Sequence, residues 1–182
     1  MNPKSQVCRT DTLYHYLFRP SAEVHASILE HGLRPLSDFP ESERWQAIQE
    51  ARPGFFEWVY QYMAKEVINK PYVNSGVFIT PIDFRLLPDT YLHDKPRFAI
   101  PLSRIDSEWA CISYEIEDRI SLPLTAESMQ SVAEFWTAEK VREWFARDNT
   151  RVFFHVPQVV TYQSGGIPIR PEEYEEFTSQ EG

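Results

Sequence analysis

Hydrophobic and polar residues alternate along "LYHYLF" at 13–18, which is the pattern of a half-buried β-strand. Two leucines and a histidine share one face of this predicted strand, and aromatic residues share the other: Leu13, His15 and Leu17 against Tyr14, Tyr16 and Phe18. His15 therefore lies beside apolar packing. It is either a core histidine with a satisfied ring or a group positioned for chemistry.

Helical spacing follows in "PSAEVHASILEHGLRP" at 20–35. Ser21 is suited to cap the N-terminus of this helix, and Gly32 is suited to end it. The apolar stripe of the predicted helix consists of Val24, Ile28 and Leu29. We interpret His25 and His31 as solvated or helix-end cations and not as ligands, since a cation suits the negative end of a helix.

The remaining patterns predict short strands and two helical blocks. In chain order they are a helical stretch at 40–71 broken at Pro53-Gly54, strands at 75–84, 97–105 and 109–116, helices at 126–136 and 138–148 capped by Thr125 and Thr137, a strand at 151–160 and an ending segment at 165–177. Thr80-Pro81 should end the 75–84 run or place it at an edge. The aromatic stripe of the first block is interpreted as core.

Strands and helices do not alternate regularly, which disfavours a doubly wound parallel sheet. The pattern predicts an α+β fold with a mostly antiparallel sheet and peripheral helices. We expect a single domain over 1–182, with a helical insertion at about 38–70 and a second helical block at about 125–148.

Composition narrows the function classes. The net charge of −9 disfavours binding to phosphate backbones of large nucleic acids and to membrane surfaces. No segment approaches the roughly 20 apolar residues of a membrane helix, and the N-terminus lacks a signal-peptide pattern, so we expect a cytoplasmic protein. Cys8 and Cys111 are expected to be free thiols without a catalytic role.

Common catalytic and metal-binding signatures are absent from the chain, and its 5 histidines have no ligand spacing, so no metal site is predicted. The consecutive pairs Glu172-Glu173 and Glu175-Glu176 are interpreted as a solvated terminal segment, with at least one member of each pair facing water.

Several short phrases occur in a telling order: "YH" in the first strand, "ILEHGLRP" at 28–35, "GVFIT" at 76–80, "PLSRI" at 101–105 and "IPIRPEEY" at 167–174. This order resembles the ADP-ribosyltransferase-like superfamily over roughly 13–36, 75–106 and 151–174. The resemblance implies a split, open β-fold that holds NAD+ and transfers ADP-ribose to an acceptor with loss of nicotinamide. It does not identify the acceptor.

The resemblance also implies roles for individual residues. In the His-Tyr-Glu branch a histidine on the first strand bonds the adenosine-side ribose, and His15 matches it. The backbone of Tyr16 would meet the amide side of nicotinamide. Phe78, or alternatively Tyr72, would stack on nicotinamide, and Thr80 would add a hydrogen bond.

The third residue of that motif is not matched. The late strand begins with Arg151 and Val152 where the family has a glutamate. Either Glu115 or Glu172 supplies the carboxylate, or the transfer activity is lost. Other superfamily members hold phosphates with arginines and histidines, for which the candidates are Arg19, Arg85, Arg97 and His155.

An alternative interpretation is a catalytically inactive member, or an unrelated α+β module, that binds a protein partner. The missing glutamate favours it. So does the aromatic-rich segment at 55–62, which would form a docking patch if its stripe is wider than one helix face.

Overall fold

The computed structural model of the 182-residue chain describes residues 11–17, 21–39, 46–47, 50–51, 54, 63–69, 82–86, 95–115, 120–135, 158–163 and 165–176. Its strands are β1 (Thr12–Tyr16), β2 (Ile82–Arg85), β3 (Arg97–Pro101), β4 (Ala110–Glu115), β5 (Ile120–Pro123), β6 (Gln158–Thr161) and β7 (Tyr174–Glu175). Its α-helices are α1 (Ala22–His31) and α4 (Ala126–Phe135). Shorter helical turns span Leu36–Asp38, Met63–Val67 (a π-helix), Leu102–Arg104, Ser107–Trp109 and Pro171–Glu173.

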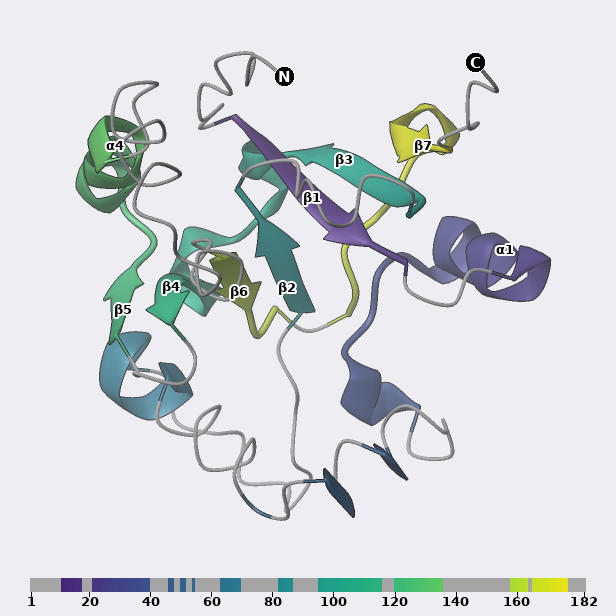
Figure 1. Cartoon of the computed structure of the whole chain (residues 1–182), viewed down its shortest axis with the longest axis horizontal. Helices are drawn as coiled ribbons and strands as arrows, with labels where there is room; N and C mark the ends of the chain where they lie inside the picture. The colour runs from purple at the N-terminus through teal and green to yellow at the C-terminus, as the bar shows by residue number, and fades with distance from the viewer. Residues whose placement is uncertain are drawn as a thin grey trace, which may run out of the picture.

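The seven strands form one sheet in the order β5-β4-β6-β2-β1-β3-β7, and every neighbouring pair is antiparallel. α1 and α4 lie at opposite ends of the molecule (Figure 1). The predicted α+β class with an antiparallel sheet is thus confirmed at this level. None of the helices in the described ranges is long and apolar enough to cross a membrane.

The pairing of β1 differs on its two sides. β1 pairs with β3 from Thr12 to Tyr16, over its whole length, whereas among the described residues its register with β2 consists of Tyr14↔Arg85. In Figure 1, β1 lies beside both of these strands. In the part of the sheet that the structure describes, the β1–β2 ladder is therefore shorter than the β1–β3 ladder.

Two strands add to the sequence-based prediction. β2 begins at Ile82, within the run predicted at 75–84, and it occupies the middle of the sheet between β6 and β1. Residues 75–81 of that run, Thr80 and Pro81 included, lie outside the described residues. β5 was not predicted, because "ISLP" is too short to show alternation, and it forms by pairing with β4.

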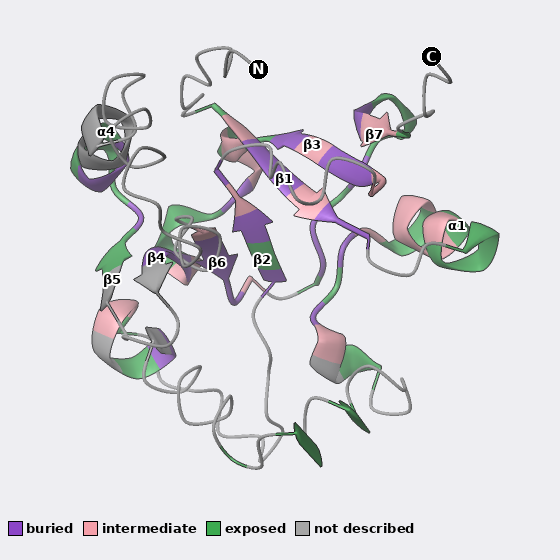
Figure 2. Cartoon of the chain, viewed as in Figure 1, coloured by how far each residue is buried: buried purple, intermediate pink, exposed green. Residues whose placement is uncertain are grey.

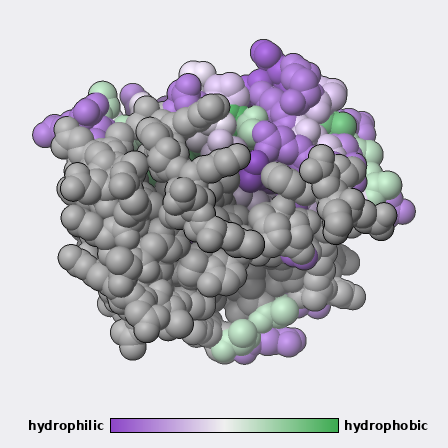
Figure 3. All heavy atoms as spheres, turned by 45° about the horizontal axis from the view of Figure 1, so that its top comes forward, coloured by the Kyte–Doolittle hydropathy of each residue, from purple (hydrophilic) through white to green (hydrophobic). Residues whose placement is uncertain are grey.

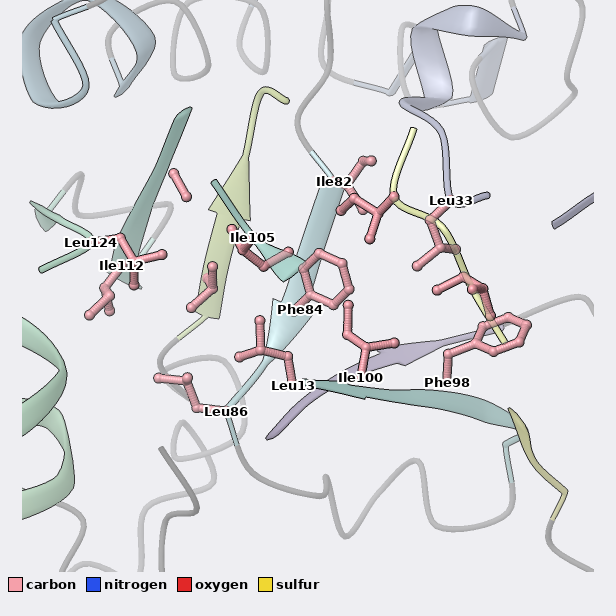
Figure 4. Close-up of a cluster of buried hydrophobic side chains, with 14 of the residues drawn as sticks. Leu13, Leu33, Ile82, Phe84, Leu86, Phe98, Ile100, Ile105, Ile112 and Leu124 are labelled. Atoms are coloured by element: carbon pink, nitrogen blue, oxygen red, sulfur yellow. The ribbon is translucent and has the colours of Figure 1, made fainter. Parts of the chain in front are cut away.

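Alternation along the strands divides the sheet into two faces. The first face carries Leu13, Phe84, Ile112 and Val159 and is the hydrophobic core. Figure 2 colours the central strands of the sheet largely as buried, and Figure 4 shows the side chains of Leu13, Phe84 and Ile112 within this cluster. The second face carries a smaller apolar cluster, Ala64, Cys111, Val160 and Tyr162, together with polar residues. The alternation of apolar residues along the strands therefore predicts the buried residues of the first face better than the mixed composition of the second face.

α1 begins and ends as predicted. The Ser21 hydroxyl accepts a hydrogen bond from the Val24 N–H at 3.1 Å. Gly32 has a φ of 78°, and a Cβ there would lie 2.6 Å from the Ile167 carbonyl oxygen, so only glycine fits. The predicted stripe is wrong at Val24, which is 42% exposed, because only Ile28 and Leu29 of the stripe pack against the core.

α4 starts at its predicted cap. The Thr125 hydroxyl accepts a hydrogen bond from the Ser128 N–H at 3.1 Å, and the Ser128 hydroxyl donates to the Pro123 carbonyl at 2.5 Å. The helix predicted at 138–148 and most of the helical insertion lie outside the described residues. Where that insertion is described, Met63–Val67 forms a π-helical turn whose Ala64 joins the smaller apolar cluster.

Candidate functional site

His15 lies on β1 and contacts the neighbouring strand β2. Its Nδ1 is 2.9 Å from the backbone carbonyl oxygen of Asp83 on β2, and its ring meets Phe84 edge-on with centroids 5.7 Å apart. The side chain is half-buried. This contact takes the place of a ladder hydrogen bond where the two strands diverge, so His15 helps to hold the sheet together.

The same contact determines the tautomer of the ring. A carbonyl oxygen can only accept, so Nδ1 must carry the proton and donate to Asp83. The neutral ring then has its lone pair at Nε2. An acceptor held in a fixed orientation by a backbone bond can receive a hydroxyl proton from a ligand, as one hydroxyl of a ribose diol offers.

Tyr16 is held on the second face by an arginine. The Arg97 guanidinium donates to Tyr16 Oη at 3.1 Å and to Glu175 at 2.6 Å, and it lies 4.9 Å from the Tyr14 ring centroid. Burial by itself would lower the pKa of Arg97, but its hydrogen bonds to Glu175 and Tyr16 outweigh that effect and raise it. The guanidinium that the sequence offers for a phosphate is thus engaged by groups of the chain.

Arg85 lies on the opposite side of the sheet from His15. It is the register partner of Tyr14, so its side chain emerges on the second face. The residue is half-buried, and within the described part of the chain its buried Nη1 atom has no hydrogen-bond partner. Arg85 and His15 therefore do not form one site.

The structure does not bring Glu115 beside His15. Glu115 ends β4, and β6 and β2 separate β4 from β1, which is about 14 Å at ordinary strand spacing. Glu172 is exposed in the turn before β7, which is the edge strand on the side of the sheet opposite β4. The side chain of Glu115 lies outside the described residues, as do Arg19, Tyr72, Phe78, Thr80 and His155.

The expectation of a solvated acidic segment is wrong for two of its four glutamates. Glu173 is buried and binds Arg104, with Nη1 to Oε2 at 2.7 Å and Nη2 to Oε1 at 2.5 Å. Glu175 pairs with Arg97, whereas Glu172 and Glu176 are exposed. Consecutive residues point in different directions, so one of each pair meets an arginine that only the fold brings near.

His25 also departs from its prediction as a solvated residue. Its ring stacks on Tyr174 with centroids 4.0 Å apart and lies 5.9 Å from Phe98. This histidine on α1 thus packs against β3 and β7 as an aromatic side chain. His31 is exposed in the last turn of α1, as expected.

Cys111 is a free thiol, as predicted, and it is buried beside Val160. Burial raises the pKa of Cys111 to about 12, so the thiol remains protonated near neutral pH and is a poor nucleophile. Cys8 lies outside the described residues.

A separate cavity of about 340 Å³ lies between the turn after β3 and the start of α4, with Leu102, Ile105 and Met129 in its lining. Its lining contains none of the residues that the sequence proposes for catalysis or ligand binding. Across the described ranges, no cluster of three or more histidine, cysteine, aspartate or glutamate side chains could hold a metal ion.

Sequence reasoning missed two polar groups of the sheet, one beside His15 and one on the second face. The Asp83 carbonyl belongs to the backbone, so no residue type signals it. Ser113 is 2% exposed on β4, and its only signal is a polar residue inside the apolar run "WACISYEI".

Comparison of the chain with family models, curated proteins and solved structures finds no match.

Proposed function

We propose that this protein is ADP-ribosyltransferase-like: it binds NAD+ or a related nucleotide beside His15, where β1 adjoins β2, and transfers ADP-ribose to an acceptor. The observation that carries the proposal is the orientation of His15. Its Nδ1–H is committed to the Asp83 carbonyl, which leaves Nε2 as an acceptor for a ribose hydroxyl. The order of the sequence phrases supports the same function.

The surroundings of His15 suit a sugar. Phe84 fixes the plane of the imidazole from one side, and the Asp83 bond fixes its rotation. A ligand that binds there meets a side chain that has little rotational freedom left to lose, which favours affinity.

The transfer step needs a carboxylate that stabilises the positive charge of an oxocarbenium-like transition state. Of the carboxylates near β1 in the sheet, Glu175 and Glu173 are engaged by Arg97 and Arg104. Nucleotide binding is therefore the part of the function that the described geometry supports, and it is the part to test first.

The test is calorimetric titration of NAD+ into the wild-type protein and His15→Asn. An asparagine amide reproduces the Nδ1–H donor toward Asp83 but has no group in place of Nε2. We expect wild-type binding with at least a tenfold weaker affinity in His15→Asn, while the two proteins unfold at similar temperatures. His31→Ala, which removes an exposed histidine, is the matched control and should bind like wild type.

Two results would contradict the proposal. Equal affinity of His15→Asn and wild type would exclude His15 from the site. Absence of binding at millimolar NAD+ would remove the nucleotide function altogether and favour the protein-binding alternative. If binding is found, released nicotinamide measured during incubation with NAD+ tests the transfer step.

The protein-binding alternative has no patch among the described residues. The large exposed apolar side chains come from three separate elements: Val24, Phe39 and Leu122. On the face shown in Figure 3, the described surface residues are mostly hydrophilic with small separate apolar spots. The aromatic segment at 55–62 lies outside the described residues.

A further inference from the structure

Two buried polar atoms on the second face of the sheet lack hydrogen-bond partners within the described part of the chain: Nη1 of Arg85 and Oγ of Ser113. A buried donor without a partner costs free energy, and the cost is greater for a charged group. Such atoms are rare in folded proteins, and each needs a physical explanation.

The strand register places both atoms in one row. Ser113 on β4 is opposite Gln158 on β6, and Gln158 is opposite Arg85 on β2. Directly opposed residues of antiparallel strands project to the same face, so all three side chains emerge together. The Cα atoms of Ser113 and Arg85 are about 10 Å apart at ordinary strand spacing. A long arginine side chain and one small ligand can bridge that separation.

The three side chains offer the same kind of group. Arg85 presents charged N–H donors, Gln158 an amide donor and Ser113 a hydroxyl donor. No ion-pair partner of Arg85 is found among the described residues, in contrast to Arg97. The neighbouring pair Cys111↔Val160 is buried and apolar, so the row borders a dry region where a charge-assisted hydrogen bond is strong.

We propose that Arg85, Gln158 and Ser113 form a binding site for a phosphoryl group. A phosphoryl group has several acceptor oxygens: the dianion of a monoester has no donor, and the hydrogen phosphate dianion has a single P–OH. Its tetrahedral oxygens can meet donors that arrive from three strands, whereas a planar carboxylate has only two oxygens to share. The site lies on the face opposite His15 and does not depend on the proposed nucleotide function.

The test is calorimetric titration of inorganic phosphate, with sodium chloride at equal ionic strength as the reference. Arg85→Gln removes the charge, and Ser113→Ala removes the hydroxyl. We expect at least tenfold weaker phosphate binding in the first variant and about threefold in the second. Arg34→Gln alters an exposed arginine already paired with Asp38 and should bind phosphate like wild type.

Thermal unfolding supplies a second readout. Phosphate should raise the unfolding temperature of wild type more than chloride does, and it should not do so in Arg85→Gln. Without phosphate, Arg85→Gln should unfold at or above the wild-type temperature, since it no longer contains a half-buried charge without an ion-pair partner among the described residues. A titration with glycerol 3-phosphate distinguishes a phosphate ester from the free ion as the tighter ligand.

The proposal is wrong if phosphate stabilises wild type no more than chloride, or if Arg85→Gln and Ser113→Ala keep the wild-type affinity for it. His15→Asn should leave phosphate binding unchanged, and Arg85→Gln should leave NAD+ binding unchanged. Failure of the nucleotide proposal is therefore distinguishable from failure of this one.

Discussion

Arg97 and Arg85 lie on the same face of one sheet, on the two strands that flank β1, and their surroundings differ. Arg97 is opposite Glu175 across the β3–β7 ladder, and the two form an ion pair with a 2.6 Å contact. Arg85 is opposite Gln158 across the β2–β6 ladder, and its Nη1 has no hydrogen-bond partner among the residues that the structure describes. One cross-strand residue thus makes the difference between an arginine that stabilises the sheet and one that is available to an anion.

Of the substitutions that test the difference between Arg97 and Arg85, Arg97→Gln should have the largest effect on stability. It removes a charged hydrogen bond to Glu175, the bond to Tyr16 and the contact with the Tyr14 ring, so we expect a loss of about 3 kcal/mol in the free energy of unfolding. Urea denaturation checks it. The matched Arg85→Gln in phosphate-free buffer should change stability by less than about 0.5 kcal/mol. Equal losses in the free energy of unfolding would show that the two arginines contribute equally to stability.

The ionisation of Cys111 reports whether water is excluded from the second face of the sheet, on which Arg85 also lies. The ordinary pKa of the Cys111 thiol, 9.0, rises to about 12 in the fold, so the unfolded thiol ionises first as the pH increases. The stability due to the neutral buried thiol is fully present below pH 9 and is lost as the pH rises toward 12. At pH 10 the loss should be about 1.4 kcal/mol.

Urea denaturation at pH 7 to 10 measures that loss, with Cys111→Ala as the control for other groups that titrate in this range. The variant should show a smaller alkaline loss than wild type. Identical slopes for the two proteins would mean that water reaches Cys111 and that the neighbouring row is not dry.

Glu175→Gln tests the partner of Arg97. The Glu175 side chain is 42% exposed, so solvent screens the pair and we expect a loss of only about 1 kcal/mol. The loss should shrink at high salt. A loss as large as that of Arg97→Gln would place most of the energy in the ion pair and little in the tyrosine contacts.

Gln158→Glu should have the smallest effect on stability and the sharpest effect on binding. It gives Arg85 the cross-strand carboxylate that Arg97 already has, so we expect a gain of about 0.5 kcal/mol. The phosphate-dependent rise in unfolding temperature should disappear, because the new carboxylate competes for the guanidinium and repels the anion. A variant that still responds to phosphate like wild type would show that Arg85 does not face Gln158 in the way the register requires.

Local signals predicted α1 and the start of α4 well. Ser21, Gly32 and Thr125 act through their own backbone neighbourhood, and caps of this kind can be recognised in a sequence. β5 was missed, because a four-residue strand is stabilised by its partner and not by its own pattern. The candidate site was predicted in part. His15 is placed on a strand as expected, but its Asp83 partner is 68 residues away in the chain.

The sequence by itself determined the α+β class, the antiparallel character of the sheet and the position of His15 on a strand face shared with Leu13. These follow from periodicity and capping, which act over a few residues. Only the tertiary structure decided that Arg97 is paired while Arg85 has no ion-pair partner among the described residues, that Glu173 is buried, and that His25 stacks on Tyr174. The physical reason is that electrostatic and packing partners are chosen by strand order and register, which join residues that no local pattern connects.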